Sequence, residues 1–144
     1  MAICKAMLAK KVYIAALLNG KAVAKRIVER HKTDTIIVIC SGSHQHFCLE
    51  DFYGAGYLIE ELVALFDGWE LSDAAKLAVS FYQDNMEKVK EVLEGSRLGE
   101  KLIQNGFKEE IDYISQRGVL SIVPYLHHGK LTVEGNEMQR EMMI

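Results

Sequence analysis

Residues 35–40 read TIIVIC, and this stretch does most to decide the fold. Its unbroken row of apolar, mostly β-branched side chains predicts a strand covered on both faces, as in a parallel sheet. A second apolar run, VYIAAL at residues 12–17, predicts another buried strand. Between them, the apolar positions of residues 21–31 are spaced for one face of a helix. The strand–helix–strand order indicates an α/β fold, layered αβα, with a small, largely parallel or mixed sheet.

The second half of the chain is predicted to be rich in helices. Amphipathic spacing and capping residues indicate helices over 49–66, 74–84, 87–94, 96–104 and 108–116, and residues 2–10 also have helical spacing. The run at 119–126 contains Pro124 and is interpreted as an edge strand, with a turn at His128-Gly129 that lets residues 131–133 pair back. We expect one α/β domain over residues 1–133 and a polar, disordered tail over 134–144.

The composition is that of a single globular domain. The 144 residues are 49% hydrophobic and 26% charged, which excludes a disordered chain. The net charge of −3 gives no bulk attraction to nucleic acid or to an anionic membrane surface. No apolar stretch approaches the ~20 residues that a membrane span needs. Three cysteines are too few for a disulfide framework, so we expect a protein of the reducing cytoplasm.

Two candidate phosphate sites follow the two predicted strands. Ligands of α/β proteins bind beyond the carboxyl ends of strands, where backbone N–H groups at a helix start favour anions. The first candidate is Asn19, which is followed by Gly20, and the second is the loop of Ser41, Gly42 and Ser43. Both patterns also fit simpler structures, namely a helix N-cap at Asn19 and an ordinary strand-to-helix turn at residues 41–43.

Glu50 and Asp51 are the candidate metal ligands. Their carboxylate oxygens suit Mg²⁺, a hard cation that keeps several of its waters. Adjacent side chains on a helix diverge by about 100°, so we expect one direct ligand and one structural or water-mediated partner. The alternative is that both acids only complement the helix dipole. His44 and His46, with cysteines nearby, do not have a standard zinc spacing and are interpreted as a solvated loop.

Several blocks of the sequence resemble a known family in their order and spacing. They are ALLNGKAVA at 16–24, IVICSG at 37–42, FCLEDFYGAG at 47–56 and SRLGEKLIQNGF at 96–107. Together they are similar to the C-terminal half of 2-phosphosulfolactate phosphatases, the ComB family, over roughly residues 2–133. The Glu-Asp-x-x-x-Ala-Gly pattern is the most specific of these blocks.

The resemblance implies a Mg²⁺-dependent phosphatase with an α/β fold. Members convert 2-phospho-3-sulfolactate to 3-sulfolactate and phosphate, on the route to coenzyme M. Carried over residue by residue, Asn19, Gly42, Glu50 and Asp51 become the candidate site. Mg²⁺ in such a hydrolysis neutralises phosphoryl oxygens and orients or activates water. No general base can be named from these residues.

The chain differs from the family pattern chiefly because it lacks the motifs of the family's first half. The motifs of the family's first half, including a Thr-Thr-Asn-Gly-Thr block, do not occur, and Ser41 and Gly20 stand where alanine is usual. We therefore expect a half that is inactive alone and that forms a homo-oligomer or associates with the missing N-terminal half. The alternative is a non-catalytic module, derived from the same fold, for small-molecule binding or oligomerisation.

Overall fold

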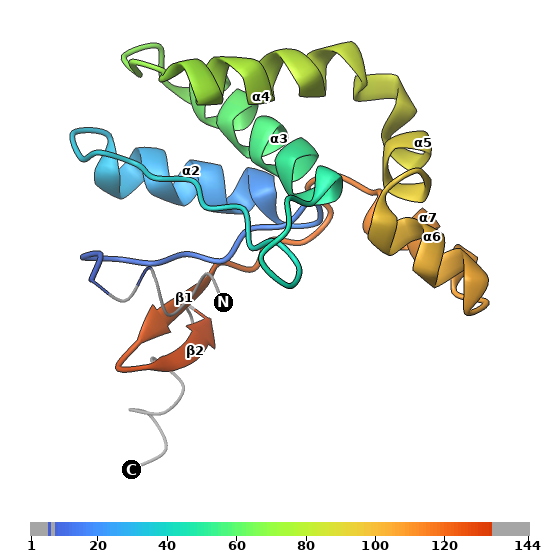
Figure 1. The fold of residues 1–144 in the computed structure, drawn as a ribbon. Helices are drawn as coiled ribbons and strands as arrows, with labels where there is room; N and C mark the ends of the chain where they lie inside the picture. Colours follow the sequence, from blue (N-terminus) through green and yellow to red (C-terminus); the bar gives the residue numbers. More distant parts are fainter. Residues whose placement is uncertain (1–5, 7, 134–144) are drawn as a thin grey trace.

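The computed structural model describes residue 6 and residues 8–133. In chain order the elements are α2 (Gly20–His31), α3 (Leu49–Leu65), α4 (Asp73–Asp84), the 3-10 turn η1 (Met86–Lys88), α5 (Val89–Glu94), α6 (Arg97–Gln104), α7 (Lys108–Ile114), β1 (Pro124–His127) and β2 (Lys130–Val133). Figure 1 shows the helices gathered on one side of the molecule and the β1–β2 hairpin on the other. The predicted helix-rich α/β fold is confirmed.

The β1–β2 hairpin is antiparallel and has the predicted turn. Its register pairs Pro124 with Val133 and His127 with Lys130. Both turn residues, His128 and Gly129, have positive φ values of 47° and 74°. Positive φ at both central positions is typical of the type I′ turn, whose twist suits a two-residue hairpin.

The predicted strand at 12–17 is extended but is not a regular strand. It contributes an isolated antiparallel bridge between Tyr13 and Tyr125. The Ile14 N–H donates to the Pro124 carbonyl at 2.9 Å, and the Leu126 N–H donates to the Val12 carbonyl at 2.9 Å. Residues 12–14 therefore line one edge of β1, and the neighbouring chain at 119–123, predicted to be strand, remains irregular.

The prediction of a covered strand at 35–40 is wrong. These residues are extended, but no strand is assigned to them, and no described backbone group bonds to theirs. Ile37 is 77% exposed and Ile39 is 47% exposed. An apolar run forms a strand only where another chain segment offers a hydrogen-bonding ladder, and within the described part none lies against this one. As a result, the sheet of the described residues is a two-stranded antiparallel one, whereas a largely parallel or mixed sheet was expected.

Two other predicted segments lie partly or wholly outside the described residues. Most of the predicted helix at 2–10 lies outside the described residues, and residues 8–10 are turn and bend. The predicted tail at 134–144 lies wholly outside them.

Helix α3 is the centre of the packing. One apolar cluster joins it to α2 and to the chain near β1, and consists of Val23, Ala24, Ile27, Leu58, Leu62 and Val123. A second cluster joins it to α4, α5 and α7, and consists of Leu17, Tyr53, Tyr57, Tyr82, Val92, Leu93 and Ile111. Because α3 is held on both sides, its first turn is fixed in space.

Close helix contacts explain the small residues of two sequence motifs. A Cβ added at Gly56 would collide with the Ala78 carbonyl, so glycine lets α3 approach α4 closely. A Cβ added at Gly99 would collide with the Leu93 carbonyl at the end of α5. Ser96 caps α6, because its hydroxyl accepts from the Gly99 N–H at 3.0 Å. These motif residues therefore serve packing and capping.

No helix within the described ranges is long and apolar enough to cross a membrane.

Candidate functional site

Asp51 binds the loop that follows the extended 35–40 segment. Its carboxylate Oδ2 accepts a hydrogen bond from the Gly42 N–H at 2.6 Å and another from the Ser41 hydroxyl at 3.1 Å. Asp51 lies in the first turn of α3, whose position the two apolar clusters fix. The structure thus brings together Ser41, Gly42 and Asp51, three of the predicted site residues.

A tight turn follows this contact. Ser43 and His46 exchange both backbone hydrogen bonds, at 3.2 and 2.9 Å, and the two residues between them, His44 and Gln45, have positive φ. Gly42 has a φ of 67°, and a Cβ added there would lie 2.9 Å from the His46 carbonyl oxygen. Glycine is therefore required at 42 by both its conformation and its surroundings.

The exposed side chains of this turn face solvent, as predicted. His44 and His46 are exposed, and the Ser43 hydroxyl contacts only the neighbouring His44 ring nitrogen, at 3.1 Å, among described residues. Ser43 is thus near the Asp51 contact along the chain without bonding to it. Its hydroxyl remains a candidate to bind a phosphate oxygen, whereas its N–H already donates to the His46 carbonyl.

Asn19 has a different role from the one its position predicts. It is 5% exposed, and its side-chain oxygen accepts from the Ala16 N–H at 2.8 Å. Its amide nitrogen donates to the carbonyls of Ile14 and Ile122, at 3.1 and 3.2 Å. No N–H of α2 is bonded by this side chain, so the N-cap interpretation is wrong. Asn19 instead joins the extended segment at 12–17 to the chain that leads into β1.

Glu50 and Asp51 are the carboxylates available to a cation at the start of α3. Both are partly exposed, and Cys48, the N-cap residue of α3, makes no side-chain cap. Within the described ranges, no three His, Cys, Asp or Glu side chains come together in a way that could hold a metal. The protein share of a Mg²⁺ site here would thus be two adjacent carboxylates, with water and substrate oxygens completing the shell, which suits this ion.

The two nearby cysteines are held as thiols. Burial, followed by the Asp51 carboxylate, raises the pKa of Cys40. The pKa of Cys48 is also raised, by desolvation and then by Glu50 and Asp51. Since the thiolate is the nucleophilic form, neither cysteine is activated as a nucleophile at neutral pH.

A groove of 850 Å³ runs from this loop between the two extended segments. Its walls are residues 12–17 and 35–40, and α2 and α3 contribute Val23, Ile27 and Leu58. Ser41, Glu50 and Asp51 also line it. The candidate site therefore opens into a largely apolar groove, which is a usual setting for a small-molecule site.

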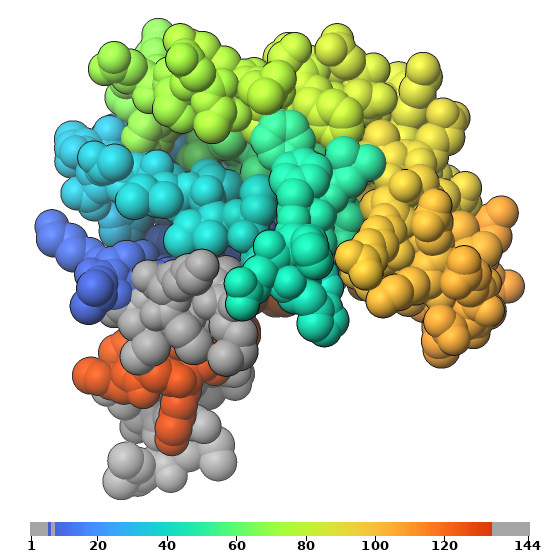
Figure 2. All heavy atoms as spheres, in the orientation of Figure 1, coloured from blue at the N-terminus to red at the C-terminus, as the bar shows by residue number. Residues whose placement is uncertain are grey.

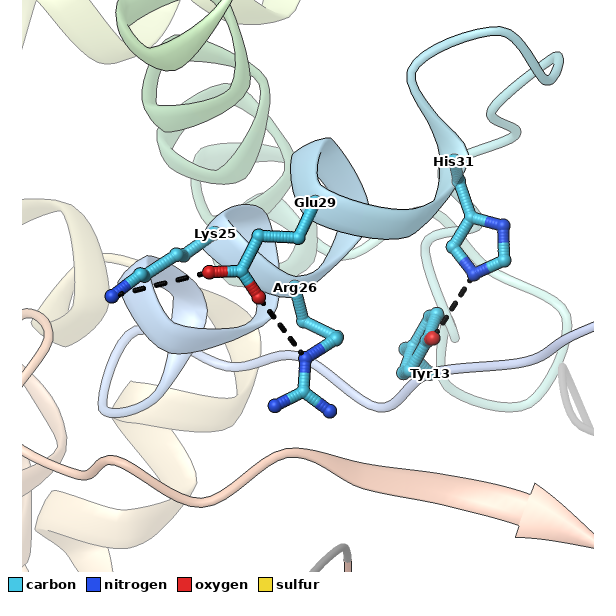
Figure 3. Close-up of polar contacts among 5 residues, drawn as sticks. All are labelled: Tyr13, Lys25, Arg26, Glu29 and His31. Atoms are coloured by element: carbon cyan, nitrogen blue, oxygen red, sulfur yellow. Dashed lines mark hydrogen bonds and ion pairs between the residues drawn. The ribbon is translucent and has the colours of Figure 1, made fainter.

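A hydrogen-bonded chain that was not predicted also lines the groove. The Tyr13 hydroxyl and His31 Nε2 are 3.1 Å apart, and His31 Nδ1 lies 2.9 Å from Asp34 Oδ2. Figure 3 shows Tyr13 and His31 facing each other from the extended segment and the end of α2. The hydrogen bond to His31 lowers the pKa of Asp34. The i, i+3 spacing of His31 and Asp34 could have indicated one of these two contacts, that between His31 and Asp34.

A family model described as 2-phosphosulpholactate phosphatase matches residues 1–129. The match includes both candidate phosphate sites and the Glu50–Asp51 pair. The chain belongs to the 2-phosphosulpholactate phosphatase family.

Curated relatives support the same assignment. The chain is 33% identical over 133 residues to a probable 2-phosphosulfolactate phosphatase of Clostridium beijerinckii, covering 92% of this chain and 55% of that protein. It is 34% identical over 138 residues to one of Carboxydothermus hydrogenoformans, covering 94% and 56%, respectively. It is 35% identical over 130 residues to one of Clostridium tetani, covering 89% and 53%. The chain thus spans about half the length of the curated relatives it matches.

Proposed function

We propose that this chain carries the phosphate- and metal-binding part of a phosphatase that hydrolyses 2-phospho-3-sulfolactate to 3-sulfolactate and phosphate. In this reaction water attacks phosphorus and the bond from phosphorus to the C2 oxygen breaks. The observation that carries the proposal is the contact of Asp51 with Gly42 and Ser41, which places a carboxylate beside a small-residue loop. The family assignment supplies the substrate class.

The loop of Ser41, Gly42 and Ser43 is the proposed phosphate-binding element. Ser41 lines the groove, and the Ser43 hydroxyl, which contacts only the His44 ring nitrogen among described residues, is the donor that the loop can offer to a phosphate oxygen. Asn19 serves in this proposal through the backbone it holds, because its own polar atoms already have partners. It is therefore a positioning residue rather than a direct ligand.

A divalent cation is proposed on electrostatic grounds. Glu50 and Asp51 place two negative charges beside the loop, and these would repel a phosphate dianion. Mg²⁺ bound by these carboxylates would reverse that repulsion, and when bound it would neutralise phosphoryl oxygens and orient water. The Ser41 hydroxyl and the Gly42 N–H keep Asp51 in position for this role.

We further propose that this chain is inactive alone and completes its site by association. It spans about half of its curated relatives, so residues from the remaining half are expected to contribute to recognition of the sulfonate and carboxylate groups. The association would be with that half of the family sequence or, as a homo-oligomer, with a further copy of this chain.

Phosphate release from 2-phospho-3-sulfolactate tests the proposal. The assay compares the chain alone with the chain co-expressed with the part of the C. beijerinckii relative that it does not match, each with Mg²⁺ and with EDTA. We expect release only from the co-expressed pair with Mg²⁺, and at least about a hundredfold loss in the pair carrying Asp51→Asn. Metal-independent release, or full activity of Asp51→Asn, would contradict the proposal.

One observation favours the alternative of a non-catalytic binding module. The groove of 850 Å³ beside Ser41 and Asp51 is largely apolar, and it could bind a small acid without any reaction. A module of this kind would bind the phosphorylated acid without turnover. Binding measured by calorimetry, together with no phosphate release from the co-expressed pair, would support the alternative.

A further inference from the structure

The two extended segments that form the walls of the groove, residues 12–17 and 35–40, are arranged like the strands of a βαβ unit, but they are not paired with each other. Residues 12–17 lead into α2 and residues 35–40 lead into α3, and both segments run in the same direction in Figure 1. In a βαβ unit the helix connects two parallel strands of one sheet, which are either adjacent or separated by other strands. Here the groove lies between the two segments.

The backbone of each wall offers hydrogen-bonding groups to the groove. Ile14 and Val12 use their groups toward Pro124 and Leu126. Because successive residues of an extended chain direct their backbone groups to opposite edges, Tyr13 and Ala15 present theirs to the other edge. No bond from the backbone of residues 13, 15 or 36–39 is made to any described residue. Both walls are thus strand edges without a described ladder partner.

The walls are also apolar where they are exposed. Ile37 and Ile39 are exposed, and Val38 and Ile36 pack against the cluster between α2 and α3. Figure 2 shows the chain around residues 35–48, in cyan to teal, at the surface of the molecule. Exposed apolar side chains beside unpaired backbone edges are typical of a site for a further strand.

We propose that the groove binds one extended, apolar β-strand, contributed by the half of the family sequence that this chain does not match. That strand pairs with residues 13 and 15 on one edge and with alternate residues of 36–39 on the other. The result is a sheet of five extended segments, in the order β2, β1, residues 12–17, the inserted strand and residues 35–40. The relatives have the necessary chain, because the matched region is only 53–56% of their length. A central strand of this kind is apolar on both faces, which suits the walls.

A second copy of this chain is a poorer occupant. Its segments at 12–17 and 35–40 already form the groove, and β1 has β2 and residues 12–14 as neighbours. The free edge of β2 is four residues long and begins with Lys130, a residue that discourages edge pairing. The proposal therefore commits to the unmatched half.

The strand would bring new residues to the candidate site. Ser41, Glu50 and Asp51 line the same groove as the unpaired edges, so one end of the inserted strand lies beside them. The pairing itself does not rest on the proposed reaction, and it would hold for a protein of any activity. A pair that assembles without phosphatase activity would separate the two proposals.

Hydrogen exchange tests the pairing. The full chain is co-expressed with the unmatched part of the C. beijerinckii relative, the complex is purified, and amide exchange is compared with that of the chain alone. We expect the amides of residues 13 and 15, and those of alternate residues within 36–39, to exchange about tenfold more slowly, or slower still, in the complex. Failure to form a complex, or a complex in which these amides exchange as before, would overturn the proposal.

Matched lysine variants locate the contact. Ile37→Lys puts a charge into the groove, whereas Leu77→Lys changes a side chain that is 63% exposed on α4. Both side chains are exposed, so both variants are expected to fold, as circular dichroism can check. We expect Ile37→Lys to weaken the complex at least about tenfold and Leu77→Lys to leave it unchanged. Equal effects of the two variants on the complex would overturn the proposal. Slow amide exchange at residues 36–39 in the chain alone, caused by dimerisation of the chain, would overturn it as well.

Discussion

Replacing Asp51 by alanine removes the acceptor that holds the loop at residues 41–43 on the first turn of α3. Two hydrogen bonds are lost, from the Gly42 N–H at 2.6 Å and from the Ser41 hydroxyl at 3.1 Å. Asp51→Asn keeps an oxygen but removes its charge, so it should weaken these bonds rather than abolish them. Glu50→Gln is the matched control, because Glu50 is adjacent and makes no hydrogen bond to Ser41 or Gly42 in the described structure.

The magnitude follows from the partners of the carboxylate. A hydrogen bond to a charged group contributes about 1.5–3 kcal/mol when it is protected from water, and an ordinary exposed one about 0.5–1.5 kcal/mol. Gly42 is partly buried and Ser41 is exposed, so we take the lower part of each range. Asp51→Ala should reduce the free energy of unfolding by about 2 kcal/mol and Asp51→Asn by about half of that.

Urea denaturation followed by Trp69 fluorescence is the assay. Trp69 is the sequence's single tryptophan, and it packs against the cluster between α2 and α3. Its indole N–H donates to the Leu62 carbonyl at 3.1 Å, so its emission should report loss of the α3 packing. We expect Glu50→Gln to be the most stable of the three variants, Asp51→Asn to be less stable, and Asp51→Ala to be the least stable. An Asp51→Ala midpoint equal to that of Glu50→Gln would refute the argument.

Three further predictions follow from the same region. In the same urea assay, Gly42→Ala should lower the free energy of unfolding by about 1–2 kcal/mol, because Gly42 has a positive φ and lies close to the His46 carbonyl. Its control, Gly54→Ala in the interior of α3, should raise the free energy of unfolding by about 0.5–1 kcal/mol, because a Cβ there meets nothing within 4 Å. Mg²⁺ at constant ionic strength should lower the raised pKa of Cys40 by screening Asp51, so mass spectrometry should find faster alkylation of Cys40 at pH 8, but not in Asp51→Asn. The pKa of Asp34 in the folded protein is lowered from its ordinary value of 3.8, so the Asp34 carboxylate stabilises the fold above pH 3.8 and loses this effect as the pH falls through its folded-state pKa. The urea midpoint of Asp34→Asn should therefore change less between about pH 5 and pH 2 than that of the unsubstituted chain.

The helices could be predicted from the sequence because their signals are local. Ser72 and Ser96 each accept a bond from a backbone N–H at a helix start, and the apolar spacing of α2 and α3 corresponds to the faces they bury. The hairpin turn at residues 128–129 also lies between adjacent segments of the chain. In each case the partners are within a few residues, so one sequence contains the whole interaction.

The two strands expected at 12–17 and 35–40 could not be predicted in this way, because a strand outside a hairpin depends on a distant partner. Residues 35–40 have strong β propensity, yet they lack a ladder in the described structure and remain exposed at Ile37. Asn19 shows the same limit at the site. Its position before a helix predicted a cap, but its side chain bonds Ile122, 103 residues away. The hydrogen bond from the Gly42 N–H to Asp51 could not be predicted either, although the sequence marked both residues as site candidates.

The central claim is that Glu50 and Asp51 bind Mg²⁺ and that the loop of Ser41, Gly42 and Ser43, which Asp51 holds, then binds phosphate. Amide NMR of the full chain, titrated first with Mg²⁺ and then with 2-phospho-3-sulfolactate, tests it most directly. We predict that Mg²⁺ shifts the amides of Gly42 and of residues 49–52, and that the substrate then shifts Gly42 and Ser43 only when Mg²⁺ is present. Unchanged amides on adding Mg²⁺, or the same substrate shifts without it, would contradict the account.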